Sequence, residues 1–322
     1  HLPEKLFDAA ALTRLRSVAD VHERVLDSFE GAQADEALAA ADVLLTGWGC
    51  PRVDAAVLAR APRVRALMHA AGSVKGHVDP VCWERGILVS SAVAANALPV
   101  AEFALAAVLF AGKGVLALTE DYRTRRDWVH LQRDWPGIGN YRRVVGVVGA
   151  SRIGRRLLEL LRPFDLQVLL FDPYVDALEA AALGACGVEL DELLAASDVV
   201  TLHAPAVPAT RHMLDRRRLG LMRDGATLVN TARGSLVDGA ALEDELVSGR
   251  LSAFLDVTDP DVPAATSPLW ELPNVLLTPH VAGAAGNELR RLGDHAVDEV
   301  VRWVVGRPLT GEVRAEDLAR IA

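Results

Sequence analysis

Two glycines and a serine near the middle of the chain have the spacing of a phosphate-binding turn. The segment VGVVGASRIG spans residues 145–154, with Gly149 and Gly154 at the outer positions of the pattern G-x-G-x-x-G and Ser151 at the middle one. Such a turn joins a buried strand to a helix whose free N-terminal amides bind a pyrophosphate. We expect serine to be tolerated, because it adds one hydroxymethyl group and its hydroxyl can donate to a phosphate oxygen.

A carboxylate follows this turn at the distance that a dinucleotide site requires. Asp172 ends the next predicted strand, 23 residues after Gly149 (172 − 149), where it would bind the hydroxyl groups of the adenosine ribose. Neither arginine nor lysine occurs in DPYVDA, residues 172–177, to hold a 2′-phosphate. The pattern therefore favours NAD over NADP. A glycine-rich turn of some other α/β protein stays open as the alternative from these residues alone.

Short strands alternate with helices along the whole chain, which is typical of α/β proteins with parallel sheets. A helix is predicted from Pro99 to about Leu118, with its proline in the first turn, and another from about Asn287 to Val305. The strands are predicted at residues 42–47, 64–72, 86–91, 143–149, 167–172, 197–203, 225–230, 251–257 and 274–280. The last six suit one doubly wound sheet.

Composition narrows the class of protein. A chain of 322 residues, 51% hydrophobic, exceeds what one core usually serves, so two globular domains are expected. The net charge of −9 would repel a phosphate backbone, so nucleic acid is not an expected partner. The most apolar run, Phe103–Ala111, is shorter than the ~20 residues that cross a bilayer, so no membrane association is expected.

The three cysteines, Cys50, Cys82 and Cys186, lie far apart without a C-x-x-C spacing. They indicate neither a disulfide framework nor a zinc site, and a reducing cytoplasm suits them best. The histidines show no ligand spacing among themselves, so no metal is predicted.

Several segments at the C-terminal ends of predicted strands carry a family resemblance. They are HAPAVPATRH (203–212), NTARGSLVD (230–238), LDVTDPDVP (255–263) and LLTPHVAG (276–283). Together with GASRIG (149–154) they closely resemble the D-isomer-specific 2-hydroxyacid dehydrogenases. In the first part of the chain, HAAGSVKGHVD (69–79) resembles the family's substrate loop, and NALPVAE (96–102) resembles the segment that opens its cofactor domain.

The resemblance implies a fold of two Rossmann-like doubly wound parallel-sheet domains. An NAD-binding domain at residues 100–283 would be inserted into a discontinuous substrate domain made of residues 1–99 and 284–322. It also implies homodimers, to which the apolar region Pro99–Leu118 would contribute. The implied activity is NAD-dependent interconversion of a 2-oxo acid and its D-2-hydroxy acid.

If the family's catalytic residues are assigned to the matching motifs of this chain, the resemblance implies catalysis by an arginine, a histidine and a carboxylate. Arg233 would bind the substrate carboxylate and polarise its carbonyl, because a guanidinium stays charged and matches a carboxylate bidentately. His280 would be the general acid and base. The family places glutamate beside this histidine, whereas alignment puts Asp261 there; aspartate is one methylene shorter, so its loop must approach His280 more closely. Asp259 is the weaker candidate for that role.

The resemblance also implies a set of binding residues. The cofactor set is Gly149, Ser151, Arg152, Ile153 and Gly154 at the pyrophosphate; Asp172 and Pro173 at the ribose; His203, Ala204, Pro205 and Thr210 near the adenosine half; and Thr231, Ala232, Asp256 and Gly283 around the nicotinamide, where Asp256 would accept from the carboxamide. The backbone amides of Ala71, Gly72 and Ser73 would hold the substrate carboxylate. His69, beside them, is expected to be a satisfied core residue.

Two alternatives compete with the dehydrogenase. Formate dehydrogenases are structural cousins, but that subgroup resembles a site with glutamine beside the histidine, and Asp261 argues against it. The chain could instead be an NADH-binding sensor, like related corepressors. Retention of arginine, carboxylate and histidine favours an enzyme, since a sensor has no need of them.

Overall fold

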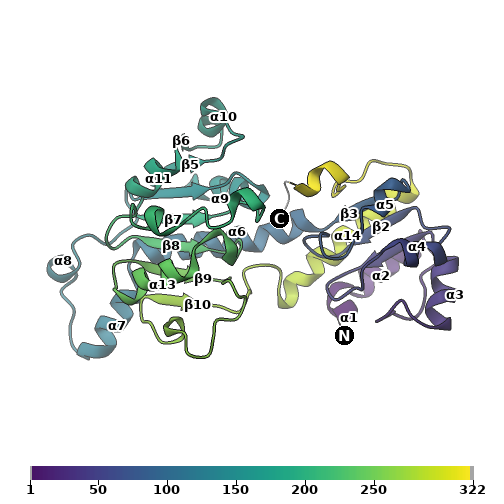
Figure 1. Ribbon diagram of the computed structural model, residues 1–322, viewed down its shortest axis with the longest axis horizontal. Helices are drawn as coiled ribbons and strands as arrows, with labels where there is room; N and C mark the ends of the chain where they lie inside the picture. Colours follow the sequence, from purple (N-terminus) through teal and green to yellow (C-terminus); the bar gives the residue numbers. More distant parts are fainter. Residues whose placement is uncertain (1, 320–322) are drawn as a thin grey trace. The chain divides into compact units, whose positions relative to one another are not determined.

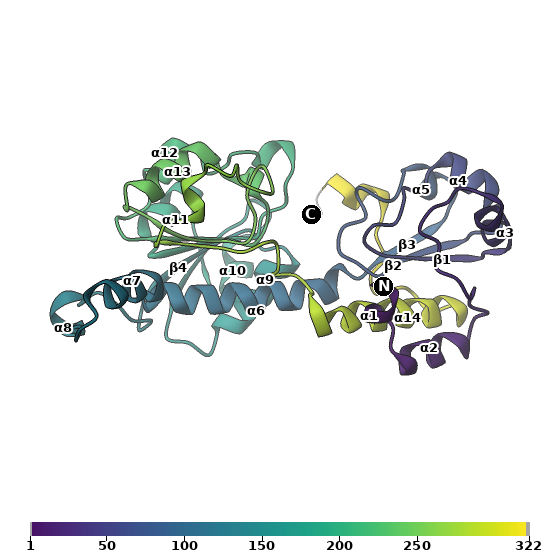
Figure 2. The same cartoon turned by 90° about the horizontal axis from the view of Figure 1, so that it is seen from below.

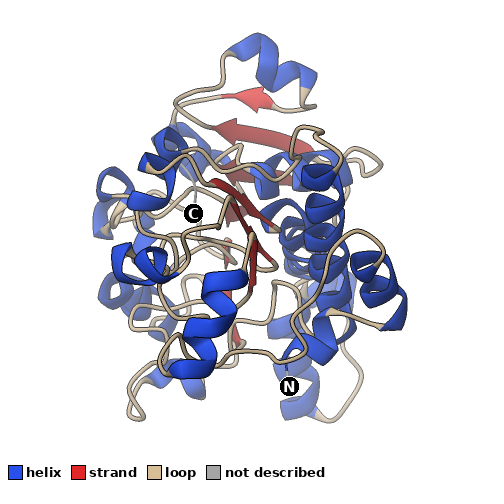
Figure 3. Ribbon diagram, turned by 90° about the vertical axis from the view of Figure 1, so that its right-hand side faces the viewer, coloured by secondary structure: helices blue, strands red, loops and turns tan. Residues whose placement is uncertain are grey.

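The computed structural model describes residues 2–319, which fall into two compact units (Figure 1). The larger unit comprises residues 98–283, and the smaller one is formed by the described residues before 98 and after 283. Strands in both units pair in parallel, so the α/β class predicted from the sequence is confirmed. Figure 3 shows the strands and the helices that alternate with them.

The larger unit contains a seven-stranded parallel sheet in the order β10-β9-β8-β7-β4-β5-β6. The chain order reverses between β4 and β7, and ligands of such sheets bind beyond the carboxyl ends of the strands at this reversal. Six of the seven strands match the predictions, and β6 was missed because two residues carry no readable pattern. The bounds are β4 (Val144–Val148), β5 (Gln167–Phe171), β6 (Cys186–Gly187), β7 (Val199–Leu202), β8 (Thr227–Asn230), β9 (Ser252–Leu255) and β10 (Val275–Leu277).

Helices cover both faces of this sheet (Figure 2). Because neighbouring side chains of a strand point to opposite faces, Val199 joins one hydrophobic cluster and Val200 the other. One face packs against α6 (Val93–Gly112), α9 (Arg152–Leu161) and α10 (Ala177–Ala182), and the other against α11 (Leu190–Ala196), α12 (Arg216–Leu219) and α13 (Gly239–Val247). Burial on both faces explains why these strands read as continuous apolar runs.

The predicted bounds of the long apolar helix were wrong. Helix α6 begins at Val93, six residues before Pro99, and ends at Gly112. Proline inside a helix leaves one backbone bond unmade, which costs about 3 kcal/mol, but packing offsets this cost. The residues of α6 buried in the larger unit's core are Ala101, Ala104, Ala107 and Val108. By length and composition alone α6 could also cross a membrane, a test that core helices of globular proteins pass as well.

Beyond α6 the chain forms an exposed arm before it enters β4. Helix α7 (Val115–Arg125) contains no buried residue, and α8 (Leu131–Asp134) follows it. Short 3-10 turns occur at η1 (Pro208–Thr210), η2 (Gly234–Leu236), η3 (Pro268–Trp270), η4 (Gly286–Glu288) and η5 (Ala315–Ala319).

The smaller unit contains three parallel strands in chain order, with helices on both faces (Figure 2). Its strands are β1 (Val43–Thr46), β2 (Ala66–His69) and β3 (Leu88–Ser91). One face packs against α3 (Ala32–Ala40), α4 (Ala55–Arg60) and α5 (Val81–Glu84), and the other against α1 (Leu2–Leu6), α2 (Ala9–Arg16) and α14 (Leu289–Val304). Helix α14 begins two residues later than predicted, after the turn η4.

A buried glutamate on α14 fastens the C-terminal segment to β3. The Glu299 carboxylate is fully buried and accepts hydrogen bonds from the Ser90 hydroxyl (2.6 Å), from the Thr310 hydroxyl (2.7 Å) and from the amides of Thr310 and Gly311 (2.9 Å each). Burial alone would raise the pKa of Glu299, but these four hydrogen bonds lower it below its ordinary value. The charged form therefore stabilises the fold.

We predict that Glu299→Gln lowers the free energy of unfolding by about 1–3 kcal/mol at neutral pH, because an amide cannot accept all four bonds. A lowered pKa stabilises above the ordinary glutamate value of about 4.3, and this contribution is lost as the pH falls through the native pKa. The difference between wild type and variant should thus shrink in acid. Urea unfolding at several pH values measures it, and equal midpoints at pH 7 would contradict the assignment.

Candidate active site

The turn after β4 has no room for side chains at its two glycines. Gly149 has φ +99°, and a Cβ atom there would lie 2.7 Å from the Ala204 amide nitrogen and 2.8 Å from the His203 carbonyl carbon. A Cβ atom on Gly154 would overlap the Gly149 carbonyl oxygen. The turn therefore packs backbone to backbone against the residues that follow β7, as a phosphate-binding turn requires.

The middle position of the motif is different, which explains the serine. Ser151 has φ −62° and ψ 179°, a conformation open to any residue, and it is the N-cap of α9. Its hydroxyl oxygen accepts from the Gly154 amide at 3.4 Å, so the hydroxyl proton stays available for a ligand. Serine thus replaces glycine without strain and caps the helix whose N-terminus faces the predicted pyrophosphate site.

Asp172, the first residue after β5, stabilises the same turn. Its carboxylate accepts from the Ala150 amide (2.7 Å) and from the Tyr174 amide (2.9 Å). Because a carboxylate has about four acceptor positions, two remain for ribose hydroxyl groups. Pro173 follows in an exposed turn, and Arg152 is exposed in the first turn of α9, whereas the next residue, Ile153, packs partly against the core.

Two buried polar atoms at the carboxyl ends of β7 and β8 lack partners, namely His203 Nδ1 and Thr231 Oγ1. The other ring nitrogen of His203 lies 2.9 Å from the Thr201 hydroxyl, and burial lowers the pKa of His203 to about 3, so the ring is neutral. An unsatisfied buried polar group costs about 1–3 kcal/mol. A dinucleotide held by the glycine turn would supply partners along this edge, so the residues present fit NAD.

Thr210 ties the loop after β7 to itself. Its hydroxyl donates to the Pro205 carbonyl (2.6 Å), and its oxygen accepts from the Val207 amide (3.0 Å). These bonds show that Thr210 stabilises the loop that contains Ala204 and Pro205.

Arg233 is held by an asparagine that the sequence analysis did not identify. Asn230 ends β8 in a buried position, accepts from the Ala232 amide (3.1 Å) and donates to the Arg233 carbonyl (2.9 Å). Arg233 itself is half-buried, and its guanidinium donates to the Ala232 carbonyl (2.6 Å). Burial lowers the pKa of Arg233, and the negative charge of Asp261 opposes that shift. The sequence did contain a signal for the role of Asn230, because it is a polar residue at the end of an apolar strand.

The loop after β9 lies directly on Gly234. A Cβ atom at Gly234 would overlap the carbonyl of Thr258 and crowd the amide of Asp259, so only glycine permits this packing. The Thr258 hydroxyl donates to the carbonyls of Pro260 (2.6 Å) and Asp261 (3.1 Å), which folds the loop back on itself. This arrangement brings the Asp261 charge within electrostatic reach of the arginine next to Gly234.

The predicted hydrogen bond between Asp261 and His280 is not made within the described residues, although both belong to the larger unit. Asp261 is exposed and influences Arg233 instead. Asp259, the weaker candidate, forms an ion pair with Arg211 (3.6 Å). An orienting carboxylate for His280 therefore stays a prediction.

The segment that contains His280 is held by Asp256, the first residue after β9, and not by Asp261. The Asp256 carboxylate is buried and accepts from the Thr278 hydroxyl (2.6 Å), the Val281 amide (2.7 Å) and the Ala282 amide (2.9 Å). His280 between them has φ 57°, a left-handed conformation that is uncommon outside glycine. Three of about four acceptor positions of Asp256 are thus used within the protein. Gly283 follows this segment at the end of the larger unit.

In the smaller unit, the predicted substrate loop follows β2. Ala71 and Gly72 are buried, and Ser73 is half-buried with its hydroxyl oxygen 3.4 Å from the Lys75 amide. Asn96 approaches Gly72 and accepts from the Ala284 amide (2.9 Å), which ties this loop to the start of the C-terminal segment.

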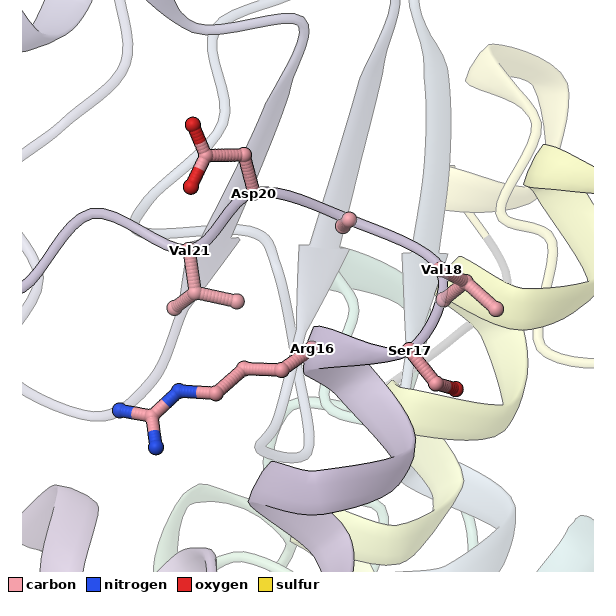
Figure 4. Close-up of a pocket in the computed structure, with 6 residues that line it drawn as sticks. Arg16, Ser17, Val18, Asp20 and Val21 are labelled. Carbon is pink, nitrogen blue, oxygen red and sulfur yellow. The ribbon is translucent and has the colours of Figure 1, made fainter.

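A groove of about 540 Å³ lies away from these residues, after α2 (Figure 4). Figure 4 shows the Arg16 guanidinium and the Asp20 carboxylate apart from each other, so these two charged groups do not converge on one point of the groove. Within residues 2–319 no group of three histidine, cysteine or acidic side chains is arranged to hold a metal ion.

The reversed strand order, the glycine turn and the carboxylate after β5 define an α/β dinucleotide-binding protein. The model of the D-isomer specific 2-hydroxyacid dehydrogenase NAD-binding domain matches residues 105–282. The chain belongs to the D-isomer specific 2-hydroxyacid dehydrogenase family, and this match lies in its NAD-binding domain. The family and the cofactor predicted from the sequence are thereby confirmed.

Similar proteins span several activities. The chain is 35% identical to D-3-phosphoglycerate dehydrogenase of Mycobacterium tuberculosis over 84% of its own length and 51% of that protein, so it spans about half the length of this relative. It is 30% identical to glyoxylate/hydroxypyruvate reductase B of Yersinia enterocolitica over 89% and 92% of the two chains. The crystal structure of the TT0316 protein from Thermus thermophilus is 31% identical, with a TM-score of 0.74 over 95% and 97% of the chains.

We predict that Gly149→Ala weakens NADH binding at least about tenfold, because the added methyl group collides with backbone and forces the turn open. The matched control is Ser151→Gly, which restores the usual motif. It should change the dissociation constant no more than about threefold, since a glycine N-cap costs only a few tenths of a kcal/mol. Quenching of tryptophan fluorescence by NADH measures both. Tight NADH binding by Gly149→Ala would show that this turn is not the phosphate site.

Proposed function

We propose that the chain is an NAD(H)-dependent oxidoreductase that interconverts a 2-oxo acid and its D-2-hydroxy acid. The observation that carries this proposal is a shared edge. Arg233 follows β8, His280 follows β10 and the glycine turn follows β4, and these strands are parallel, so all three segments lie at the carboxyl edge of one sheet. The proposed cofactor-binding turn and the two proposed catalytic residues are thus positioned by the same sheet.

Each proposed role matches the chemistry of the side chain. Bound NADH supplies the hydride. Arg233 binds the substrate carboxylate and polarises the carbonyl, for which its fixed charge and paired donors suit it. His280 gives a proton to the carbonyl oxygen during reduction and takes one during oxidation. Asp261 contributes negative charge near Arg233 and is the proposed carboxylate partner of His280, a contact that requires its loop to move.

The binding roles divide the chain into a cofactor part and a substrate part. We propose residues 100–283 as the NAD-binding domain and residues 1–99 with 284–322 as the substrate domain, in which the amides of Ala71, Gly72 and Ser73 hold the substrate carboxylate. In the cofactor domain, the turn at residues 149–154 holds the pyrophosphate and Asp172 the ribose. Asp256 is proposed chiefly to position His280, because most of its acceptor capacity is used by the segment 278–282.

We also propose a cytoplasmic homodimer. Helices α6 to α8 and their connections expose large apolar side chains that a second copy would cover, namely Phe110, Tyr122, Trp128 and Leu131. The three cysteines are unpaired, which suits a reducing compartment.

A panel of 2-oxo acids tests the proposed activity. Glyoxylate, pyruvate, hydroxypyruvate, phenylpyruvate and a branched 2-oxo acid are each mixed with NADH, and loss of NADH absorbance is followed. At least one should be reduced to the D-2-hydroxy acid. NADH binding without turnover across the panel would instead support a sensor, which the unmade contact between Asp261 and His280 also favours.

Replacing the two catalytic side chains should separate their roles. We predict that His280→Ala lowers kcat by about 10²–10⁴-fold, because proton transfer is lost, and leaves the dissociation constant of NADH unchanged. Arg233→Lys should chiefly raise KM for the 2-oxo acid, because an ammonium group cannot bind a carboxylate bidentately. Steady-state kinetics and NADH titrations measure both effects. Undiminished kcat in His280→Ala would remove that residue from the mechanism.

A further inference from the structure

Arg155 is an arginine beside the cofactor turn that the proposed function does not use. It lies in the first turn of α9, directly after Gly154. Its Nε atom donates to the Ala150 carbonyl (2.9 Å), and its Nη2 atom donates to the Glu179 carboxylate (2.7 Å). Glu179 lies in the first turn of α10, the helix that follows Asp172 in the chain. The guanidinium thus joins the turn after β4 to the first turn of the helix that follows β5.

Arg155 and Asp172 bind the two ends of one residue. The Ala150 amide donates to the Asp172 carboxylate (2.7 Å), and the Ala150 carbonyl accepts from Arg155. The amide nitrogen and the carbonyl oxygen of one residue are no more than about 4 Å apart, because only three bonds join them. The segment 172–177 contains no basic residue, but the fold brings a cation from α9 to the turn that Asp172 contacts.

Glu179 balances the charge of this cation. The two side chains form an ion pair, and both are partly exposed, Arg155 by 44% and Glu179 by 42%. A guanidinium has more N–H donors than the bonds to Ala150 and Glu179 use, and its flat fork matches a phosphate group as well as it matches a carboxylate. Arg155 therefore has the donors that a phosphate needs, but its positive charge is already matched by Glu179.

We propose that the ion pair between Glu179 and Arg155 helps the chain to select NADH over NADPH. The two cofactors differ by a phosphate group on the adenosine ribose, which carries almost two negative charges. Asp172 repels that phosphate, and Glu179 holds the guanidinium that would otherwise bind it. This inference rests on the position of Asp172 at the ribose, which belongs to the proposed function, and it assigns cofactor choice to α9 and α10 as well as to Asp172.

The variant Glu179→Gln removes the negative charge but keeps the shape of the side chain. It should lower the dissociation constant of NADPH about five- to tenfold, because the guanidinium is then free to make a charge-assisted hydrogen bond to the phosphate. NADH has no such phosphate, so its dissociation constant should stay within about twofold of the wild-type value. The gain for NADPH should shrink at high salt, because salt screens exposed charges.

The chain offers a matched control on α9. Glu159 forms an ion pair with Arg156, the arginine next to Arg155, at 2.6 Å. Glu159→Gln removes the same charge and releases this other arginine, and it should leave both dissociation constants unchanged. A double variant separates the freed cation from the lost negative charge. Glu179→Gln combined with Arg155→Gln should bind NADPH no more tightly than Arg155→Gln alone, because no guanidinium is freed.

Quenching of tryptophan fluorescence by NADH and by NADPH measures binding to the full chain and its variants. A gain in NADPH binding that requires Arg155 and is absent from Glu159→Gln supports the proposal. A wild type that binds NADPH as tightly as NADH, no gain in Glu179→Gln, an equal gain in Glu159→Gln, or a gain that persists in the double variant overturns it. Binding needs no turnover, so a chain that reduces no 2-oxo acid but shows the expected gain refutes the proposed activity alone. Reduction of a 2-oxo acid without that gain refutes the role of the ion pair alone.

Discussion

The backbone of the turn after β4 lies against the backbone that follows β7, with no space for a side chain at Gly149. This contact sits where the strand order of the larger sheet reverses, and it points the N-terminus of α9 along the carboxyl edge. The helix contributes free amides and a partial positive charge there. Asp172 stabilises the turn from the neighbouring strand by accepting the Ala150 amide. A dinucleotide site can form at this edge because these backbones approach so closely.

At the same edge of the sheet, the loops that contain Arg233 and His280 are held in place by buried polar side chains. Asn230 fixes the backbone around Arg233, and Asp256 binds three donors on either side of His280. The left-handed conformation of His280 persists because these hydrogen bonds over-determine its segment. Gly234 admits the loop after β9 and so places the Asp261 charge near Arg233. Reactive side chains thus stand on loops, while the groups that orient them are in the core.

The sequence predicted those features of the structure that neighbouring residues determine, and it did not predict features that depend on contacts between remote segments. Apolar runs in the sequence predicted the buried strands. The spacing of Gly149, Gly154 and Asp172 predicted the turn and the NAD cofactor correctly. Strand β6 is too short for any pattern, and the start of α6 was misplaced because Pro99 normally marks a first turn. The roles of Asn230 and Gly234 depend on contacts with loops remote in the chain, and no local pattern encodes these contacts. His69 is a core residue as expected, but only the fold shows that its Nε2 atom lacks a hydrogen-bond partner.

A crystal structure of the chain with bound NAD⁺ would show whether the carboxyl edge of the larger sheet is the cofactor site. We expect the pyrophosphate to accept hydrogen bonds from the amides that begin α9, and His203 Nδ1 and Thr231 Oγ1 both to gain partners, from the dinucleotide or from water that it orders. A dinucleotide bound elsewhere, or one bound at this edge that leaves both atoms unpartnered, would contradict it.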